Sequence, residues 1–402
     1  MQHRSILTPR RPALLLAAQA GLCALLVAGC GGGGMDSGGT GAAPASFAAG
    51  PITGFGSIIV NGVHFDDSTA RVSDDDGTPS TKDQLKLGMT AEVRGGAISD
   101  DGTGPRASAT DIVYGAALVG PVSSVDGVAR SLVILGQTVL VLDTTVFDER
   151  LVGGFTAISV GALLEVHGRL DPVTGIYTAT RVGQTAALAG YKIRGIVANL
   201  DTTAKTFTMG PATISYAGVT GVPTDLANGI LLAVRLQTAQ VGGLWIATRL
   251  GQGAPPVANN DAARVKGSIT SFTSVTQFSV DGLPVDASKA EFPNGTAGIV
   301  LGAQVEVRGT ANNGVIIATR VGLETQEDVR ATGFELRGAV TAIDTVAQTF
   351  VVRTVTVAYG DPAVVFKDGT AANLAVGVQL EVHGTLSADG TQVLATRIEF
   401  VR

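Results

Sequence analysis

The sequence predicts an all-β protein, a tandem array of about five small β-barrels of five to six strands each, behind a signal peptide and a flexible tether. The tandem array is predicted because one hairpin-like segment occurs five times, and internal repeats of this kind indicate a chain built from copies of one unit. Its copies are residues 88–115, 161–184 (GALLEVHGRLDPVTGIYTATRVGQ), 229–252, 302–322 and 377–400. Composition agrees: with 54 glycines and few aromatic residues, the chain favours short strands joined by tight turns.

Residues 1–29 are predicted to be a lipoprotein signal peptide. A start with three arginines precedes an uncharged apolar run at residues 13–28, which suits a signal-peptide core and is short for a transmembrane span. The run ends in LVAGC, which resembles the lipobox of bacterial lipoproteins. In that family the cysteine is lipidated and begins the mature chain, so the resemblance implies a lipid on Cys30. The alternative is an ordinary signal peptide with a chance cysteine.

Residues 30–49 are predicted to be a tether rich in Gly, Ser and Ala, a composition that behaves as flexible coil. Gly31 stands where the inner-membrane retention signal of enteric lipoproteins is aspartate. The lipobox resemblance therefore implies the outer membrane, with the protein facing the periplasm or the cell surface. Since Cys23 lies in the signal peptide, Cys30 is the only cysteine left, which excludes an internal disulfide and a thiol pair for a metal or redox site.

Five repeats follow the tether, each of roughly 70 residues, which is enough for a small barrel. Repeats 1 to 5 cover residues 50–117, 118–190, 191–254, 255–332 (with a linker at its start) and 333–402. Each repeat opens with a glycine-containing strand, continues with a hairpin, and ends with the recurrent closing hairpin. Asn61-Gly62 and Asp281-Gly282 predict two-residue hairpin turns in repeats 1 and 4.

The segment before each closing hairpin varies in length and polarity. These variable middles are predicted to be loops that offer contacts to a partner, and they cover residues 67–87, 147–160, 219–228, 287–301 and 361–376. The first contains the acidic run at residues 74–76, for which a calcium site is the alternative to a solvated loop. Its spacing is not that of a helix–loop–helix calcium site.

In repeat 2, the closing hairpin is predicted to turn at about residues 171–175. Pairing Arg169 with Ile176 gives two faces of alternating character, as expected when one face is buried and the other wet. The predicted core face holds Leu164, Val166, Tyr177, Ala179 and Arg181, and the predicted solvent face holds Glu165, His167, Thr178 and Thr180.

Two polar positions recur in the closing hairpins and suggest a repeated acid–base pair. The glutamates are Glu92, Glu165, Glu306 and Glu381, and the arginines are Arg181, Arg249, Arg320 and Arg397. A structural role is favoured, because Ala233 replaces the glutamate in repeat 3 and Asp111 replaces the arginine in repeat 1. A third position alternates between His (His167, His383) and Arg, which predicts a basic surface position, since a guanidinium cannot replace a metal-binding imidazole.

No catalytic residue, metal site or cofactor is predicted, and no ligand-binding residue can be named. The sequence has no glycine-rich phosphate loop followed by Lys-Ser/Thr and no Gly-x-Ser-x-Gly elbow. A nucleic-acid partner is not expected, because the net charge is −6, about −9 after removal of the signal peptide. Trp245 is the only tryptophan available for base stacking.

The opening of repeat 1, GPITGFGSIIVNGVHF at residues 50–65, resembles a family of bacterial lipoprotein domains catalogued as a domain of unknown function. That family occurs in tandem behind a lipobox and closes with hairpins similar to EVxG…ATR. The resemblance implies small barrels similar to the OB-fold and no established activity. We therefore expect a non-enzymatic binding or spacer module anchored to a membrane by the lipid on Cys30, with an envelope polysaccharide or protein as partner. The alternative is an envelope hydrolase or carbohydrate-active enzyme with a site in one repeat.

Overall fold

The computed structural model describes residues 45–102, 104–186, 189–253, 257–259, 261–325, 327–328, 330 and 333–401. The predicted signal peptide, the lipidation residue Cys30 and most of the predicted tether lie outside the described residues. Strands dominate the rest, with short 3₁₀ helices at Lys82–Gln84, Gly154–Ala157 and Ala371–Asn373. Among the described residues, no helix has the length and hydropathy needed to span a membrane.

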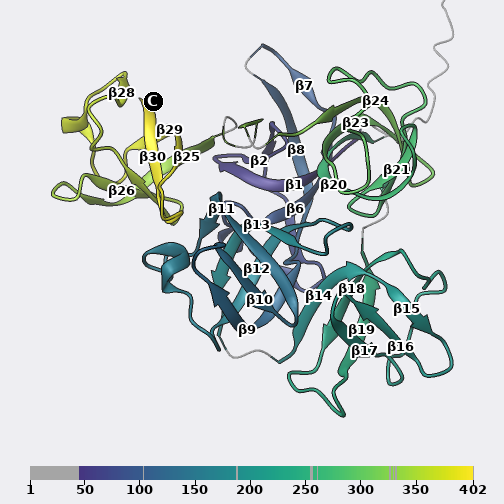
Figure 1. Cartoon of the computed structure of the whole chain (residues 1–402). Coiled ribbons are helices and arrows are strands. Elements are labelled where there is room, and N and C mark those ends of the chain that lie inside the picture. The colour runs from purple at the N-terminus through teal and green to yellow at the C-terminus, as the bar shows by residue number, and fades with distance from the viewer. Residues whose placement is uncertain are drawn as a thin grey trace, which may run out of the picture. The chain divides into compact units, whose positions relative to one another are not determined.

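The strands of the five repeats follow one another along the chain (Figure 1), and β1 begins five residues before the predicted start of repeat 1. Repeat 1 contains β1 (Ala45–Phe55), β2 (Ile58–Val60), β3 (Val63–Asp66), β4 (Arg71–Asp74), β5 (Pro79–Ser80), β6 (Thr90–Gly96), β7 (Ser99–Asp100) and β8 (Pro105–Tyr114). Repeat 2 contains β9 (Leu118–Asp126), β10 (Ser131–Ile134), β11 (Gln137–Phe147), β12 (Leu163–Leu170) and β13 (Tyr177–Gln184). Repeat 3 contains β14 (Tyr191–Ile196), β15 (Ala198–Asp201), β16 (Thr206–Met209), β17 (Ala212–Ser215), β18 (Leu231–Leu236) and β19 (Trp245–Gln252). Repeat 4 contains β20 (Ala262–Ser274), β21 (Gln277–Val280), β22 (Leu283–Asp286), β23 (Gln304–Asn312) and β24 (Val315–Leu323). Repeat 5 contains β25 (Phe334–Asp344), β26 (Thr349–Val352), β27 (Val355–Ala358), β28 (Val365–Lys367), β29 (Gln379–Leu386) and β30 (Val393–Phe400).

Each repeat closes into a small barrel by the same cycle of strand pairs. In repeat 2, β9 pairs with β10, β10 with β11, β11 with β13, β13 with β12, and β12 returns to β9. The β11–β13 pair is parallel and the other four are antiparallel. Repeat 4 shows the same cycle, from β20 through β21, β22, β24 and β23 back to β20. The predicted all-β array of small barrels is confirmed.

The two predicted hairpin turns are present, and they explain the glycine in each opening strand. Asn61 and Asp281 adopt φ values of 51° and 47°, and each is followed by a glycine with positive φ, as two-residue hairpins require. The side chain of the turn residue folds over the opening strand. A Cβ on Gly50 would lie 2.4 Å from Oδ1 of Asn61, and one on Gly267 would lie 2.2 Å from Oδ2 of Asp281. Glycine therefore makes room there for the turn residue.

The predicted register of the repeat 2 closing hairpin is wrong by two residues. The turn is where it was expected, but Arg169 lies opposite Thr178, and beyond a bulge at Thr180, His167 lies opposite Arg181. The two-residue offset arises at the turn, where the backbone N–H of Asp171 donates to the carbonyl of Ile176. The bulge adds one more residue of offset beyond it. Simple alternation shows neither the closing pair of the turn nor the extra residue, so the sequence pattern could not give this register.

The same bulge recurs in all five closing hairpins and accounts for the recurrent motif. In each case the extra residue is the threonine of Ala-Thr-Arg or its counterpart, namely Thr110, Thr180, Thr248, Thr319 and Thr396. Across from the bulge a glycine approaches the partner strand closely. A Cβ there would lie 2.2–2.4 Å from a carbonyl oxygen, at Gly95, Gly168, Gly309 and Gly384. The glycine of EVxG and the threonine of ATR thus form the same bulge. Repeat 3 has Leu236 in place of the glycine.

Burial follows the predicted core face, with one exception beside the bulge. Leu164, Val166, Tyr177 and Ala179 are buried as expected, and so is Arg181. His167 is fully buried, so its prediction as a basic surface residue is wrong for repeat 2. Its Nδ1 accepts a hydrogen bond of 3.2 Å from the backbone N–H of Thr90 in repeat 1. The imidazole lies where the two repeats touch.

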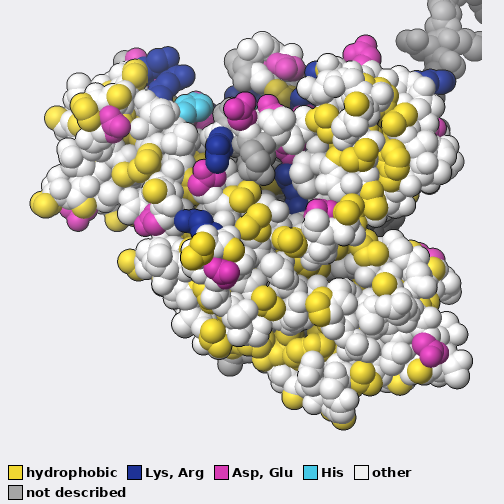
Figure 2. Space-filling view, viewed as in Figure 1, with side chains coloured by type: hydrophobic (Ala, Val, Ile, Leu, Met, Phe, Trp, Pro, Cys, Tyr) yellow, Lys and Arg dark blue, Asp and Glu magenta, His cyan; other side chains and the backbone are white. Residues whose placement is uncertain are grey.

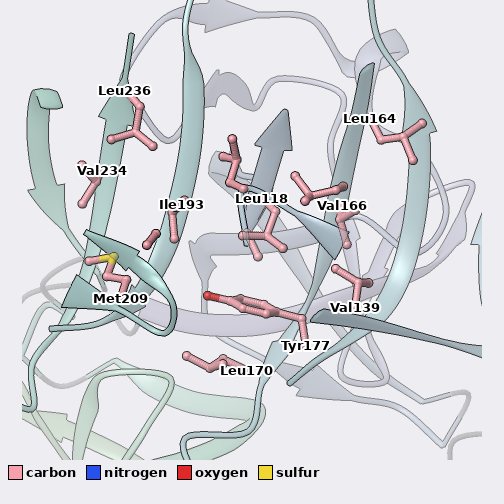
Figure 3. Close-up of a cluster of buried hydrophobic side chains, with 14 of the residues drawn as sticks. Leu118, Val139, Leu164, Val166, Leu170, Tyr177, Ile193, Met209, Val234 and Leu236 are labelled. Carbon is pink, nitrogen blue, oxygen red and sulfur yellow. The ribbon is translucent and has the colours of Figure 1, made fainter. Parts of the chain in front are cut away.

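The barrels are joined by strand pairing and by shared cores. The opening strands β9 and β14 pair between repeats 2 and 3, while β1 pairs with β20 of repeat 4 and β25 of repeat 5. Because β1 begins at Ala45, residues 45–49 belong to a strand and not to the tether predicted there. Repeats 2 and 3 share one cluster of buried apolar side chains, repeats 1 and 5 share another, and repeat 4 has its own with Phe47 added from β1. Figure 3 shows the first cluster around Tyr177, whose hydroxyl donates to the carbonyl of Arg194 over 2.8 Å.

Candidate functional site

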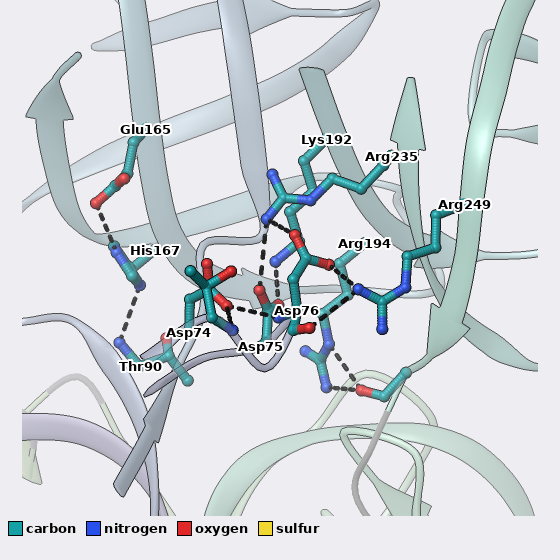
Figure 4. A network of polar contacts seen from close by, with 12 residues as sticks. Asp74, Asp75, Asp76, Thr90, Glu165, His167, Lys192, Arg194, Arg235 and Arg249 are labelled. Atoms are coloured by element: carbon teal, nitrogen blue, oxygen red, sulfur yellow. Dashed lines mark hydrogen bonds and ion pairs between the residues drawn. The ribbon is translucent and has the colours of Figure 1, made fainter. Parts of the chain in front are cut away.

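The acidic run of repeat 1 binds basic side chains of repeat 3. Asp75 forms an ion pair with Lys192, and Asp76 contacts Arg235 at 2.5 Å and Arg249 at 3.0 Å (Figure 4). We call these five residues the repeat 1–3 clamp. Lys192 is 2 % exposed, and this burial lowers its pKa while Asp75 opposes the shift. Two of the three carboxylates that raised the calcium alternative thus hold cationic side chains.

The remaining acid of the run shapes the loop itself. Oδ1 of Asp74 accepts hydrogen bonds from the backbone N–H groups of Asp76 and Thr78, at 3.0 and 2.7 Å. These bonds within the loop define the turn that presents Asp75 and Asp76. The first variable middle therefore mediates contact between repeats, a use that its polarity alone did not indicate.

A missing glutamate explains why repeat 3 can supply Arg235 to the clamp. In repeats 2, 4 and 5 the closing-hairpin glutamate contacts the basic residue two positions further along its own strand. These pairs are Glu165–His167 at 3.1 Å, Glu306–Arg308 at 2.6 Å and Glu381–His383 at 3.2 Å. Repeat 3 has Ala233 in the glutamate position, so Arg235 has no such neighbour and reaches Asp75 and Asp76 instead. None of these contacts joins the recurrent glutamate to the recurrent arginine as an acid–base pair.

The same glutamate position also faces the opening strand. In repeats 4 and 5 the residue opposite is basic: Glu306 lies opposite Lys266 and Glu381 opposite Arg337. Directly opposite positions on paired strands bring side chains into contact range. Repeats 4 and 5 thus share this cross-strand pair, whereas in repeat 2 Glu165 lies opposite Val119.

Repeats 1 and 3 each keep only one half of this cross-strand pair. Glu92 of repeat 1 lies opposite Ala49, and Arg194 of repeat 3 lies opposite Ala233. The two unmatched halves line the same cavity. This cavity has a volume of about 580 Å³ and is walled by repeats 1, 3 and 4, and its charged lining residues are Asp75, Glu92, Arg194, Asp225, Arg249, Lys266 and Asp281.

Glu92 is a partly buried residue of the cavity wall, and its carboxyl group has no hydrogen-bond partner among the described residues. Burial raises its pKa to about 7, while the positive charge of Arg194 acts in the opposite direction and the negative charge of Asp75 adds to the increase. A carboxyl group in a dry environment holds its proton because the charged form is poorly solvated. Near neutral pH, Glu92 is therefore divided between its neutral and charged forms.

Arg194 is held by backbone carbonyl groups. Its Nε and Nη2 donate to the carbonyl of Gly253 at 2.8 and 2.6 Å, and Nη2 also donates to the carbonyl of Asp281 at 3.1 Å. These bonds fix the guanidinium plane at the cavity wall. The Nη1 group has no hydrogen-bond partner in the part of the chain that the structure describes, which leaves its donors for another molecule.

Asp281, the turn residue of repeat 4, lines this cavity as well. Burial raises its pKa, opposed by the charges of Arg194 and Arg169. Its Oδ1 accepts a hydrogen bond of 3.3 Å from the backbone N–H of Ser268. Since Asn61 fills the equivalent place in repeat 1, the first role of Asp281 is to complete the turn.

The other basic residues of the wall are paired. Arg249 belongs to the clamp, and Lys266 contacts Glu324 at 3.0 Å. Glu324 is also held at 2.9 Å by Arg169 of repeat 2, and these two cations keep its pKa low despite its burial. Lys266 and Arg169 also border a second, more apolar cavity of about 640 Å³. In the first cavity, Glu92, Asp225, Asp281 and the free edge of Arg194 are the charged groups that have no ion-pair partner among the described residues.

Comparison with known proteins identifies the repeated unit. Residues 119–183, 266–322 and 337–399 match the model of the family described as Domain of unknown function (DUF5666). The chain contains a repeated domain of unknown function. The three DUF5666 segments lie in repeats 2, 4 and 5, whereas repeats 1 and 3 lie outside them, as does the opening at residues 50–65 that suggested such a family. No curated protein matches the chain.

The repeats outside the DUF5666 segments are the two that form the clamp and contribute Glu92 and Arg194. Sequence reasoning named the glutamate and arginine positions but not Lys192, Arg194 or Asp281 as parts of a site. The sequence feature that could have identified them is Ala233, which departs from the recurrent glutamate. It counted as an argument against an acid–base pair, and it also leaves Arg194 and Arg235 without a partner in their own repeat.

Proposed function

We propose that this protein is a lipid-anchored component of the cell envelope that acts as a non-catalytic binding or spacer module. The lipid on Cys30 would hold it at the outer membrane, facing the periplasm or the cell surface, and an envelope polysaccharide or protein would be its partner. The observation that carries the proposal is the joining of repeated barrels by strand pairing around a polar cavity. Such an arrangement builds one ligand pocket from several repeats.

Sequence and surface features support this proposal. The apolar run ending in LVAGC precedes a segment whose composition is that of a flexible tether. On the face in Figure 2, charged side chains of both signs are scattered among apolar and neutral ones, without a continuous basic stripe. A protein of this kind is suited to recognise its partner by shape and local polar contacts.

The anchor is tested by replacing Cys30 with alanine and by treating cells with globomycin, an inhibitor of lipoprotein signal processing. We expect both to change the apparent size of the protein and to move it out of the membrane fraction. Unchanged size and partition in both experiments would show that Cys30 carries no lipid.

The binding role is tested by pull-down from envelope extract with the full chain carrying Cys30→Ala. Peptidoglycan and outer-membrane polysaccharide serve as separate baits in parallel. Enrichment of one of them, or of one envelope protein, over a beads-only control would support the proposal. Recovery at background level for all of them would argue for a spacer without a binding role.

An envelope hydrolase is the second candidate, and the cavity gives one observation in its favour. Glu92 and Asp281 both line it, and burial raises the pKa of each, a feature that is frequent among catalytic acids and bases. A broad hydrolase screen of the full chain tests this role, with Glu92→Gln and Asp281→Asn as variants. Turnover that both variants abolish would replace the binding module with an enzyme.

A further inference from the structure

We propose that the cavity between repeats 1, 3 and 4 binds a small zwitterion, an amino acid or a short peptide, whose ammonium group contacts Glu92 and whose carboxylate contacts Arg194. The inference deepens the proposed binding function and rests on it. It assigns a ligand class to Glu92, one of the recurrent glutamates, and to Arg194, which no recurrent motif singles out.

Glu92 and Arg194 both lack a cross-strand neighbour of opposite charge. Repeats 4 and 5 place a cation opposite the closing-hairpin glutamate, but Glu92 has Ala49 there and Arg194 has Ala233. Each unmatched charge therefore lacks its cross-strand neighbour, and both line one cavity. They do not form an ion pair with each other, so a molecule carrying both opposite charges can be held between them.

Three of the other charged residues on the cavity wall already have ion-pair partners. Asp75 and Arg249 are engaged in the clamp, and Lys266 is engaged by Glu324. Asp225 and Asp281 add carboxylates to the cavity wall, but a ligand with a single charge would still contact only one of Glu92 and Arg194. A zwitterion satisfies both, and a cavity of about 580 Å³ falls within the usual range of about 300–1,000 Å³ for small-molecule sites.

Backbone carbonyls fix the geometry of the Arg194 guanidinium. Three hydrogen bonds to the carbonyls of Gly253 and Asp281 use Nε and Nη2 and hold Arg194 in place. The donors on Nη1 remain for a carboxylate oxygen. An arginine held in this way needs little reordering when it binds an anion, which favours affinity.

The proposal has a characteristic pH dependence. The ammonium group needs the charged form of Glu92, whose pKa is about 7, whereas a peptide amino group loses its proton near pH 8. The charges that face Glu92 are Arg94 on its own strand, Asp75 on the clamp loop, and Lys192 and Arg194 on β14. Affinity is therefore highest near pH 7.5 and falls roughly five- to tenfold at pH 6 and at pH 9.

The test is isothermal titration calorimetry of the full Cys30→Ala chain with alanyl-alanine. N-acetyl-alanyl-alanine and alanyl-alanine amide, which lack the ammonium and the carboxylate respectively, serve as ligand controls. We expect alanyl-alanine to bind, each control to bind at least tenfold more weakly, and Glu92→Gln to reduce affinity at least tenfold. Glu306→Gln changes the same position of repeat 4, away from the cavity, and is expected to bind as the unchanged chain does.

A second variant addresses Arg194 without removing its structural bonds. Ala233→Glu places a carboxylate opposite Arg194, where it competes for the Nη1 donors, and is expected to abolish binding. Absence of binding for both alanyl-alanine and free alanine at millimolar concentration would overturn the inference, as would equal affinity for the acetylated peptide or for Glu92→Gln. If an envelope partner is recovered equally well with Glu92→Gln, the binding function holds and only this inference fails.

Discussion

Replacing Glu92 with glutamine should stabilise the ligand-free protein at alkaline pH and leave it unchanged at acidic pH. Burial raises the pKa of Glu92 from 4.5 to about 7 in the folded chain, so the folded state binds the proton more tightly than the unfolded state does. The contribution is favourable below pH 4.5 and is lost as the pH rises to about 7, because a buried carboxylate must then form. A difference of this size corresponds to roughly 3 kcal/mol at pH 8, at about 1.4 kcal/mol for each tenfold change in proton affinity. Glutamine has a similar shape and never carries the charge.

The measurement is the midpoint of urea unfolding between pH 5 and pH 8.5, monitored by the fluorescence of Trp245. We expect Glu92→Gln and the unchanged chain to differ least at the acidic end of this range, to diverge as the pH rises to about 7, and to keep a constant difference above it, with the variant the more stable. Glu306→Gln is the control, because its carboxylate is paired with Arg308 at the surface. A stability difference that does not vary with pH, or a variant that is less stable at pH 8, would refute the assignment of Glu92 as a buried, unpaired carboxyl group.

Three further substitutions test the rest of the structure. Asp75→Ala leaves the buried ammonium of Lys192 without its partner, which should lower the free energy of unfolding by about 3–5 kcal/mol. Adding Lys192→Met should recover part of that loss. No recovery would show that Lys192 is not the partner of Asp75. Gly95→Ala should lower the thermal midpoint clearly, by an overpacking cost of about 1–3 kcal/mol, because its Cβ would lie 2.4 Å from the carbonyl of Ser108. Gly96→Ala is the matched neighbour, with open space around a Cβ, and equal effects of the two alanines would contradict the bulge geometry. Asp281→Asn places the turn residue of repeat 1 in repeat 4 and removes a carboxyl group whose pKa is raised by burial. The variant should therefore be more stable than the unchanged chain in thermal unfolding at pH 8. A loss of stability at that pH would contradict the burial of this carboxyl group.

The sequence was sufficient for the barrels because their determinants are local. Alternation of apolar residues placed Leu164, Val166, Tyr177 and Ala179 in the core, and the Asn-Gly and Asp-Gly turns identified two hairpins. The predicted register of the closing hairpin was wrong because the closing pair of the turn and the bulge beyond it both depend on how the two strands pair, and no residue type requires either. The burial of His167 was not predicted, because it depends on that strand pairing and on the contact of its imidazole with repeat 1.

The candidate site was beyond sequence reasoning because it lies between repeats. Comparing the five copies showed which positions recur, and recurrence indicates the barrel framework. The clamp and the cavity depend on contacts between residues more than 100 positions apart, such as Asp75 with Lys192. Which repeat touches which could not be derived from five similar units, since similar opening strands give each repeat several possible neighbours.

Ala233 is the residue on which the difference between repeat 3 and the others depends, and Ala233→Glu tests that directly. A glutamate there would lie opposite Arg194 and two positions before Arg235 on the same strand, the arrangement that repeats 4 and 5 use for their own pairs. Arg235 would then be drawn toward the new carboxylate and away from Asp76, which it now contacts at 2.5 Å. We expect faster amide hydrogen exchange in the loop at residues 71–80, because it would keep fewer of its bonds to repeat 3. Unchanged exchange in that loop would mean that Lys192 and Arg249 hold the clamp without Arg235, and that the absent glutamate is not what frees repeat 3 to bind repeat 1.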